Sequence, residues 1–280
     1  MRIKRGNFYE AMEIARDVKD RVEHARDKGE PIDYLTFVPD GEPTLDINLG
    51  NEIAILKSYG IKIAVITNAS LLWQEDVRQA LQKADLVSLK VDSVSSEIWH
   101  RINRPHKSLK LETVLEGMLK FAYIFKRKII TETMLIRNLN DGREELERIA
   151  GFLMKLKPVK AYLTIPTRPP ARKAIMVPEE QKLNMAFQAF NGRLDSVECL
   201  MGYERNEFAI TNNLEDDLLA ITSVHPMRKE AVLELLMKAG TDWGIVEKLI
   251  EDGSLIESEY RGMKFYLRRL STEEVKTGEP

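Results

Sequence analysis

The chain has 280 residues, of which 42 are Lys or Arg and 44 are Asp or Glu, so its formal net charge is -2. A nearly balanced charge argues against a protein that binds nucleic acid or anionic lipid through bulk charge alone. Hydrophobic residues make up 44% and charged residues 31% of the chain, which is the composition of a globular protein and excludes a disordered or fibrous one.

Helical and strand patterns alternate over the first 165 residues. Apolar residues spaced three and four apart among charges predict an amphipathic helix over 8–28. The predicted elements that follow are a strand at 34–38, a helix at 51–58, a strand at 62–66, a helix at 74–83, a strand at 86–91, a helix at 111–125, a strand at 129–136, a helix at 143–156 and a strand at 161–165. Apolar strands separated by helices predict an α/β protein with a parallel sheet, and a barrel or partial barrel fits best.

The pattern changes after Arg168-Pro169-Pro170, where a helix at 177–190 and short strands at 196–201 and 207–211 are predicted. Three helical stretches and a hairpin then predict a winged-helix-like α+β module; they lie at 214–223, 227–238, 242–251 and 255–267. Between residues 215 and 269 there are 8 basic and 11 acidic residues, which favours an intrachain or dimer contact over nucleic-acid binding. The expected divisions are a partial barrel at 1–175, a connection at 176–212, the module at 213–270 and a disordered tail at 271–280.

Polar residues follow the predicted strands. In βα folds, the loops at the carboxyl ends of the strands carry the catalytic and ligand-binding residues. After the first strand, Gly41 lets the backbone approach a ligand, and Pro43 fixes Glu42 to accept a hydrogen bond from an ammonium group. The same stretch is also ordinary turn chemistry. Thr67 and Asn68 follow the second strand.

The third strand places Ser88, Lys90 and Asp92 on one face. Lys and Asp are rarely buried unless they are paired or functional, so this face is either part of a site or a structural ion pair between Lys90 and Asp92. Glu132 lies within the fourth strand, and Lys90 is a plausible partner for it. Arg168, after the fifth strand, could grip a carboxylate or phosphate, or be a solvated loop residue.

The chain also lacks several common site motifs. The single cysteine, Cys199, rules out an intrachain disulfide and a cluster held by several cysteines of these residues. The four histidines have no metal-binding spacing, although His106 lies in a loop with Asn103 that could overhang the strand ends. No apolar run reaches the roughly 18 residues of a membrane span, and no signal-peptide core follows Met1. We therefore expect a cytoplasmic protein without membrane contact.

Four stretches in order resemble the radical SAM superfamily: GEPT, TNAS, SLKVDSVSSEIWHRINRP and TETMLIRNLND. The resemblance is to Fe-S oxidoreductases similar to the wyosine-synthase (tRNA imidazoline-forming) enzymes and covers residues 8–170, with GYERNEFAIT and the C-terminal module as further matches. It implies a partial (βα) TIM-like barrel that binds a [4Fe-4S] cluster and S-adenosylmethionine (SAM). It further implies that one electron from a donor protein cleaves SAM to a 5′-deoxyadenosyl radical, which abstracts hydrogen from a substrate such as tRNA.

The resemblance assigns roles to individual residues. The motif that meets the methionyl amino group corresponds to Gly41, Glu42 and Pro43, and the SAM-lining segment to Thr67 and Asn68. The strand that approaches the SAM ribose or carboxylate bears Ser88, Lys90 and Asp92. Glu132 and Asn138 occupy positions expected to face SAM or substrate. Arg168 is a further cofactor-binding candidate because of its place after the fifth strand.

The family's CxxxCxxC motif, which ligates three irons of the cluster, is absent, and no strand precedes the helix at 8–28. Either Met1 is a late start or boundary that omits the first strand and cluster loop, or the protein is a degenerate member that has lost its cluster; we favour the late start. Three hypotheses follow: a radical SAM enzyme whose complete form carries the cluster, a non-catalytic scaffold, and, ranked last, aldolase-type catalysis through a Schiff base on Lys90.

Overall fold

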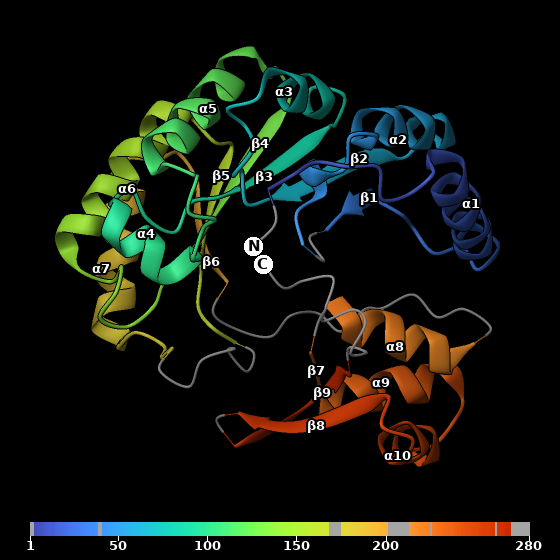
Figure 1. Ribbon diagram of the computed structural model, residues 1–280. Helices are drawn as coiled ribbons and strands as arrows, with labels where there is room; N and C mark the ends of the chain where they lie inside the picture. Colours follow the sequence, from blue (N-terminus) through green and yellow to red (C-terminus); the bar gives the residue numbers. More distant parts are fainter. Residues whose placement is uncertain are drawn as a thin grey trace. The chain divides into compact units, whose positions relative to one another are not determined.

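The computed structural model describes residues 3–38, 41–167, 175–200, 213–224, 226–260 and 262–269. The described residues fall into two units (Figure 1). The first unit contains residues 3–166 and 175–200, and the second contains the residues from 213 onward. The domain divisions expected from the sequence stay predictions, as does Arg168, which lies outside the described residues together with the predicted strand at 207–211 and the tail at 271–280.

A six-stranded sheet in the order β1-β2-β3-β4-β5-β6 forms the first unit, and every neighbouring pair of strands is parallel. The strands are β1 (Tyr34–Phe37), β2 (Lys62–Thr67), β3 (Leu86–Lys90), β4 (Lys128–Met134), β5 (Lys160–Thr164) and β6 (Val197–Leu200). The helices are α1 (Ala11–Asp27), α2 (Leu49–Leu56), α3 (Glu75–Leu81), α4 (Ser96–Asn103), α5 (Leu111–Ile124), α6 (Arg143–Leu156) and α7 (Glu180–Asn191), with short 3-10 turns η1 (Pro43–Leu45) and η2 (Lys57–Tyr59). The predicted α/β fold with a parallel sheet is confirmed.

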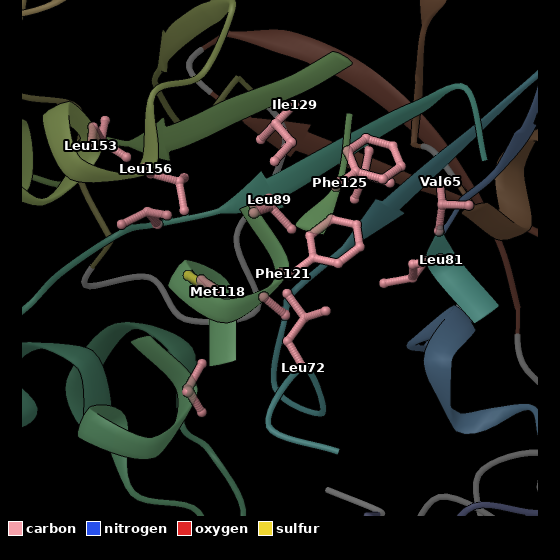
Figure 2. Packing of buried hydrophobic residues seen from close by; sticks show 14 of the residues in the cluster. Val65, Leu72, Leu81, Leu89, Met118, Phe121, Phe125, Ile129, Leu153 and Leu156 are labelled. Carbon is pink, nitrogen blue, oxygen red and sulfur yellow. The ribbon is translucent and has the colours of Figure 1, made fainter. Parts of the chain in front are cut away.

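Apolar side chains fix the helices against the sheet. Figure 2 shows Phe121 of α5, and Phe125 directly after this helix, beside Leu89 of β3, and the two rings stack with their centroids 4.8 Å apart. Phe121 and Leu89 have no exposed surface. Burying a side chain of this size contributes about 1.5–3 kcal/mol, so this cluster holds α5 on the sheet.

Two elements of the first unit differ from the sequence prediction. Residues 96–103 form α4, where the prediction left a loop. The strand predicted at 196–201 is present as β6, but it joins the parallel sheet beside β5, whereas the prediction placed it in a separate connection. A helix of eight residues gives too short a pattern to be recognised by periodicity. It is stabilised by tertiary contact, because Trp99 is buried against the core.

The second unit contains α8 (Leu214–Val224), α9 (Lys229–Ala239) and α10 (Gly244–Glu251), with β7 (Met227–Arg228), β8 (Leu255–Tyr260) and β9 (Met263–Arg268) in an antiparallel sheet of order β7-β9-β8. Val232, Leu249 and Tyr266 are buried in its own core. Three helices and a hairpin agree with the sequence, while the short β7 was not predicted; the likeness to a winged helix stays a prediction. No helix in the described parts of the chain has the length and apolar character to cross a membrane.

Candidate functional site

The parallel strands bring the predicted site residues to one edge of the sheet. We call this edge the mouth; it is formed by the carboxyl ends of β1 to β5 and the described residues of the loops that follow them. Strand register sets Ile66 of β2 beside Ser88, and Lys90 beside Glu132 of β4. Ser88 is 6% exposed and lies two residues before Lys90, so it faces the same side deeper in the sheet.

Lys90 is held by two carboxylates at the mouth. Its Nζ lies 3.3 Å from Asp92 Oδ1 and 3.3 Å from Glu132 Oε1. Burial by itself would lower the pKa of Lys90, but Asp92 and Glu132 together outweigh it, so the pKa lies above the ordinary value of 10.5. The amine is therefore a fixed cation. The contact predicted between Glu132 and Lys90 is present, and so is the ion pair with Asp92.

Asp92 also joins three segments of the mouth. Its side chain has no exposed surface, Oδ1 accepts a hydrogen bond from the Met134 amide at 2.9 Å, and Oδ2 accepts one from Asn103 Nδ2 at 2.6 Å. Asp92 thus ties β4 and the end of α4 to the loop after β3. Because these donors and Lys90 occupy its oxygens, Asp92 positions Lys90 and is not a free ligand group.

A second carboxylate, Glu42, ties the loops after β1 and β2. Glu42 Oε1 accepts hydrogen bonds from Thr67 Oγ1 at 2.5 Å and from Thr44 Oγ1 at 2.7 Å, and Oε2 accepts one from the Asn68 amide at 2.8 Å. Burial raises the pKa of Glu42, and the hydrogen bonds from Thr67, Thr44 and Asn68 oppose that rise only in part. Glu42 is therefore a brace between two strand ends.

Asn140, which the sequence did not single out, fixes the loop after β4. Its side chain has no exposed surface; Nδ2 donates to the carbonyls of Asp92 and Met134, both at 2.8 Å, and Oδ1 accepts from the Ile136 amide at 2.7 Å. Asn138, in the same loop, is exposed with a left-handed φ of 59°. No single residue of the motif RNLND marks Asn140 as the buried one, so sequence reasoning missed it.

A small cavity of about 60 Å³ lies beneath the mouth, lined by Asn68, Lys90, Asp92, Asn103 and apolar residues that include Trp99 and Met118. Asn103 Oδ1 is buried without a hydrogen-bond partner among the described residues. The loop around Asn103 was predicted to overhang the strand ends, and Asn103 does contact Asp92. Gly41, Glu42 and Pro43 instead line a larger groove of about 580 Å³ along β1.

The residues present do not fit an iron-sulfur cluster. Cys199 is the single cysteine of the sequence and lies on β6. Within the described ranges, no three His, Cys, Asp or Glu side chains gather closely enough to hold a metal ion. The mouth instead offers the cation of Lys90 and, on Glu132, an acceptor whose side chain is 36% exposed.

Comparison with known proteins identifies the family. The model of the radical SAM superfamily matches residues 3–153. "UPF0026 protein MJ1312" of Methanocaldococcus jannaschii is 44% identical over 280 residues, which are 99% of this chain and 87% of that protein.

Two solved structures share the fold. Streptococcus suis SuiB bound to S-adenosylmethionine has a TM-score of 0.51 and 14% identity, covering 70% of this chain and 46% of SuiB. TYW1 with a lysine-pyruvate adduct has a TM-score of 0.50 and 16% identity, covering 69% of this chain and 66% of TYW1. At these identities the two structures support the fold alone, whereas the family match covers more than half of the chain. The chain therefore belongs to the radical SAM superfamily.

Proposed function

We propose that this chain is the SAM-binding barrel of a radical SAM enzyme. The observation that carries the proposal is the ammonium group of Lys90, fixed between Asp92 and Glu132 at the mouth. SAM carries an α-carboxylate, an α-ammonium group and ribose hydroxyls. A cation beside an acceptor suits such a ligand, and SuiB, with the same fold, binds SAM.

Each residue has a proposed task. Lys90 pairs with the methionyl carboxylate, while Glu132 accepts a hydrogen bond from the ammonium group or a ribose hydroxyl. Asn68 offers a side-chain amide on the loop after β2, where its Oδ1 already accepts from the Ser70 amide at 2.9 Å. Asp92 and Glu42 act as braces that hold these groups in place.

SAM supplies hydrogen-abstracting radical chemistry in this superfamily only together with a [4Fe-4S] cluster. One cysteine cannot hold that cluster, so we assign SAM binding alone to these residues. We propose that the cluster cysteines come from polypeptide outside the 280 residues. A tRNA substrate and an electron-donor protein are proposed from the resemblance of the sequence to the wyosine-synthase group.

Two alternatives are weaker. A Schiff base requires a neutral amine, and the carboxylates that raise the pKa of Lys90 keep this amine protonated at neutral pH. In a non-catalytic scaffold, a lysine held by two carboxylates at the mouth would have to serve stability alone. Buried ion pairs seldom add stability over apolar packing, so the scaffold does not explain this arrangement. We therefore rank SAM binding above both.

Calorimetric titration of the chain with SAM tests the proposal. We expect binding, and a loss of about 10-fold or more in affinity in Lys90→Met, because a charge-assisted hydrogen bond contributes about 1.5–3 kcal/mol. Lys155→Met, which removes an exposed lysine of α6, is the matched control. Equal affinity in Lys90→Met and Lys155→Met, with both variants folded, would reject the proposed site.

A further inference from the structure

Basic side chains gather on the segment that joins α4 to α5. Residues 98–111 contain four Lys or Arg, two His and no Asp or Glu, although the whole chain has a formal net charge of -2. The four Lys and Arg residues are exposed, and none of them forms an ion pair with another described residue. We call these four residues the basic surface: Arg101, Arg104, Lys107 and Lys110.

Packing on the other side of this segment holds the basic surface beside the mouth. Trp99 is 8% exposed and Leu109 is 7% exposed, and both line the cavity beneath the mouth. Asn103 Nδ2 donates a hydrogen bond to Asp92 Oδ2 at 2.6 Å. Trp99 and Asn103 are four residues apart and share one side of α4, whereas Arg101, two residues after Trp99, lies on the opposite side. The basic surface therefore faces outward while its segment contacts the mouth.

Helix stability does not account for these four cations. A cation near the carboxyl end of a helix is favourable, which explains Arg101 in the last turn of α4. Lys110, however, is the N-cap of α5, where the partial positive charge of the helix end disfavours a cation, and it makes no side-chain capping bond. Glu97 and Glu112 flank the segment, and neither forms an ion pair with another described residue. Like charges clustered in this way repel one another, and an anionic ligand relieves the repulsion.

The kind of side chain present favours a nucleic acid over a protein or a membrane. Every exposed large hydrophobic residue of the described chain lies outside residues 98–111. Protein interfaces have an apolar or aromatic centre, and segments that bind a membrane surface insert an apolar face. The phosphate backbone of a nucleic acid binds through Lys and Arg without apolar area. A base inside a duplex cannot reach the mouth, so a single strand is the form that fits.

Asn103 adds an acceptor between the basic surface and the mouth. Its Oδ1 is buried without a hydrogen-bond partner within the described part of the chain, and the residue lines the cavity of about 60 Å³ together with Asn68 and Lys90. Buried acceptors are normally satisfied. Nucleotides bring N–H and O–H donors, and amide side chains are among the groups that pair with them. A nucleotide at the mouth would therefore find a polar contact next to the basic surface.

We propose that the basic surface binds the phosphate backbone of a single-stranded nucleic acid and so brings one of its nucleotides to the mouth. The delivery to the mouth rests on the proposed function, which places SAM there, whereas binding of the backbone requires neither SAM nor a cluster. The nearly balanced charge of the whole chain does not oppose the proposal, because phosphates respond to a local cluster of cations.

The salt dependence of RNA binding tests the proposal. Fluorescence anisotropy follows a labelled uridine oligonucleotide of about 12 nucleotides, which has no stable structure of its own. Four phosphate contacts predict a loss of about 50-fold in affinity between about 50 and 200 mM KCl, because each contact contributes about 0.7 to the slope of log K against log salt for single strands. No binding at the lower salt concentration, or a loss of less than about 10-fold, overturns the proposal.

A fourfold change of the basic surface to glutamine tests which residues bind. It should weaken RNA binding by about 10-fold or more at the lower salt concentration and remove most of the salt dependence. The control removes four charges from exposed positions of α1, α6 and α9 and should bind like the wild type: Arg16→Gln, Arg21→Gln, Lys155→Gln and Lys238→Gln. Equal weakening in both variants overturns the proposal. Lys107→Gln alone should lower the slope by about 0.7, which gives a second test if the fourfold variant does not fold.

Other anions and SAM separate the remaining outcomes. A polyglutamate peptide or vesicles rich in phosphatidylserine that bind more tightly than the RNA would assign the basic surface to a protein or a membrane and overturn the proposal. Calorimetric titration with SAM is run on the same proteins. RNA binding at the basic surface without SAM binding would reject the proposed function alone, and SAM binding without RNA binding would reject the basic surface alone.

Discussion

Lys90 of β3 and Glu132 of β4 are partners in strand register, and Lys90 Nζ donates a hydrogen bond to Glu132 Oε1 at 3.3 Å. Asp92 Oδ1 lies at the same distance from Lys90 Nζ. Thr164 of β5 donates to the same Glu132 oxygen at 3.2 Å, so the contact spans three neighbouring strands. One ammonium group therefore couples two carboxylates, and removal of any member changes the energy of the others.

Replacing Lys90 with an uncharged residue should reveal the energetic coupling between its ammonium group and the two carboxylates. In Lys90→Met the side chain of Asp92 keeps no exposed surface but loses its counter-charge, so we expect a loss of about 2–4 kcal/mol in the free energy of unfolding. Lys90→Met combined with Asp92→Asn should cost less than the sum of the two single changes. Urea denaturation of the four proteins measures the coupling, and strict additivity would contradict the ion pair.

The brace formed by Glu42 predicts a second loss of stability. Glu42→Gln replaces one acceptor oxygen with an NH₂ group, which cannot accept the hydrogen bond that the Asn68 amide now donates to Oε2 at 2.8 Å. We expect a loss of about 1–3 kcal/mol in urea denaturation. Glu234→Gln, an exposed change on α9, is the control. Equal stability of the two variants would mean that Glu42 does not brace the strand ends.

Local patterns in the sequence predicted the contacts at the mouth. The alternation of Ser88, Lys90 and Asp92 with apolar residues is a property of the strand itself, so it could be recognised without tertiary information. Glu132 was recognised for the same reason, because a carboxylate within an apolar strand requires a partner. The contact between Lys90 and Glu132 then followed from the order of neighbouring strands.

For residues that are buried by tertiary packing, the sequence contains no local pattern that predicts their burial. Glu52 lies in a helical segment, where a glutamate is ordinary, and yet it is 3% exposed in the folded chain. Asn140 could not be distinguished from Asn138, although one is buried and the other exposed. The helix α4 depends on Trp99 and on the contact between Asn103 and Asp92, which joins residues 11 positions apart.

Substitution by alanine should have opposite effects on stability at two helical glycines, Gly117 and Gly151. A Cβ on Gly117 of α5 would lie 2.5 Å from the Trp73 amide nitrogen and 2.6 Å from the Leu72 carbonyl carbon, and neither backbone atom can move without displacing α5. We expect Gly117→Ala to cost about 1–3 kcal/mol or more. Gly151→Ala on α6 meets nothing within 4 Å and should gain about 1 kcal/mol through helix propensity. Thermal unfolding compares the pair, and a neutral Gly117→Ala would contradict this packing.

Glu52 Oε1 is buried without a hydrogen-bond partner among the described residues, and the burial of this carboxyl group makes the stability of the protein depend on pH. Its pKa is about 7 in the folded chain against an ordinary value of 4.5, so the folded state binds more protons between these two values. The contribution of Glu52 to stability therefore falls as the pH rises from 4.5 to 7 and is lowest above 7, by up to about 3 kcal/mol. Glutamine is uncharged, so the Glu52→Gln variant should not lose stability in this way as the pH rises.

Thermal unfolding of Met1–Pro280 and its Glu52→Gln variant at pH 4, 6 and 8 measures this effect. The two proteins should unfold at similar temperatures at pH 4, and the variant should become progressively more stable than the wild type toward pH 8. Glu234→Gln corrects for the general pH dependence of the chain, because Glu234 is an exposed residue of α9. A Tm difference between wild type and Glu52→Gln that stays constant across the three pH values would contradict the raised pKa of Glu52.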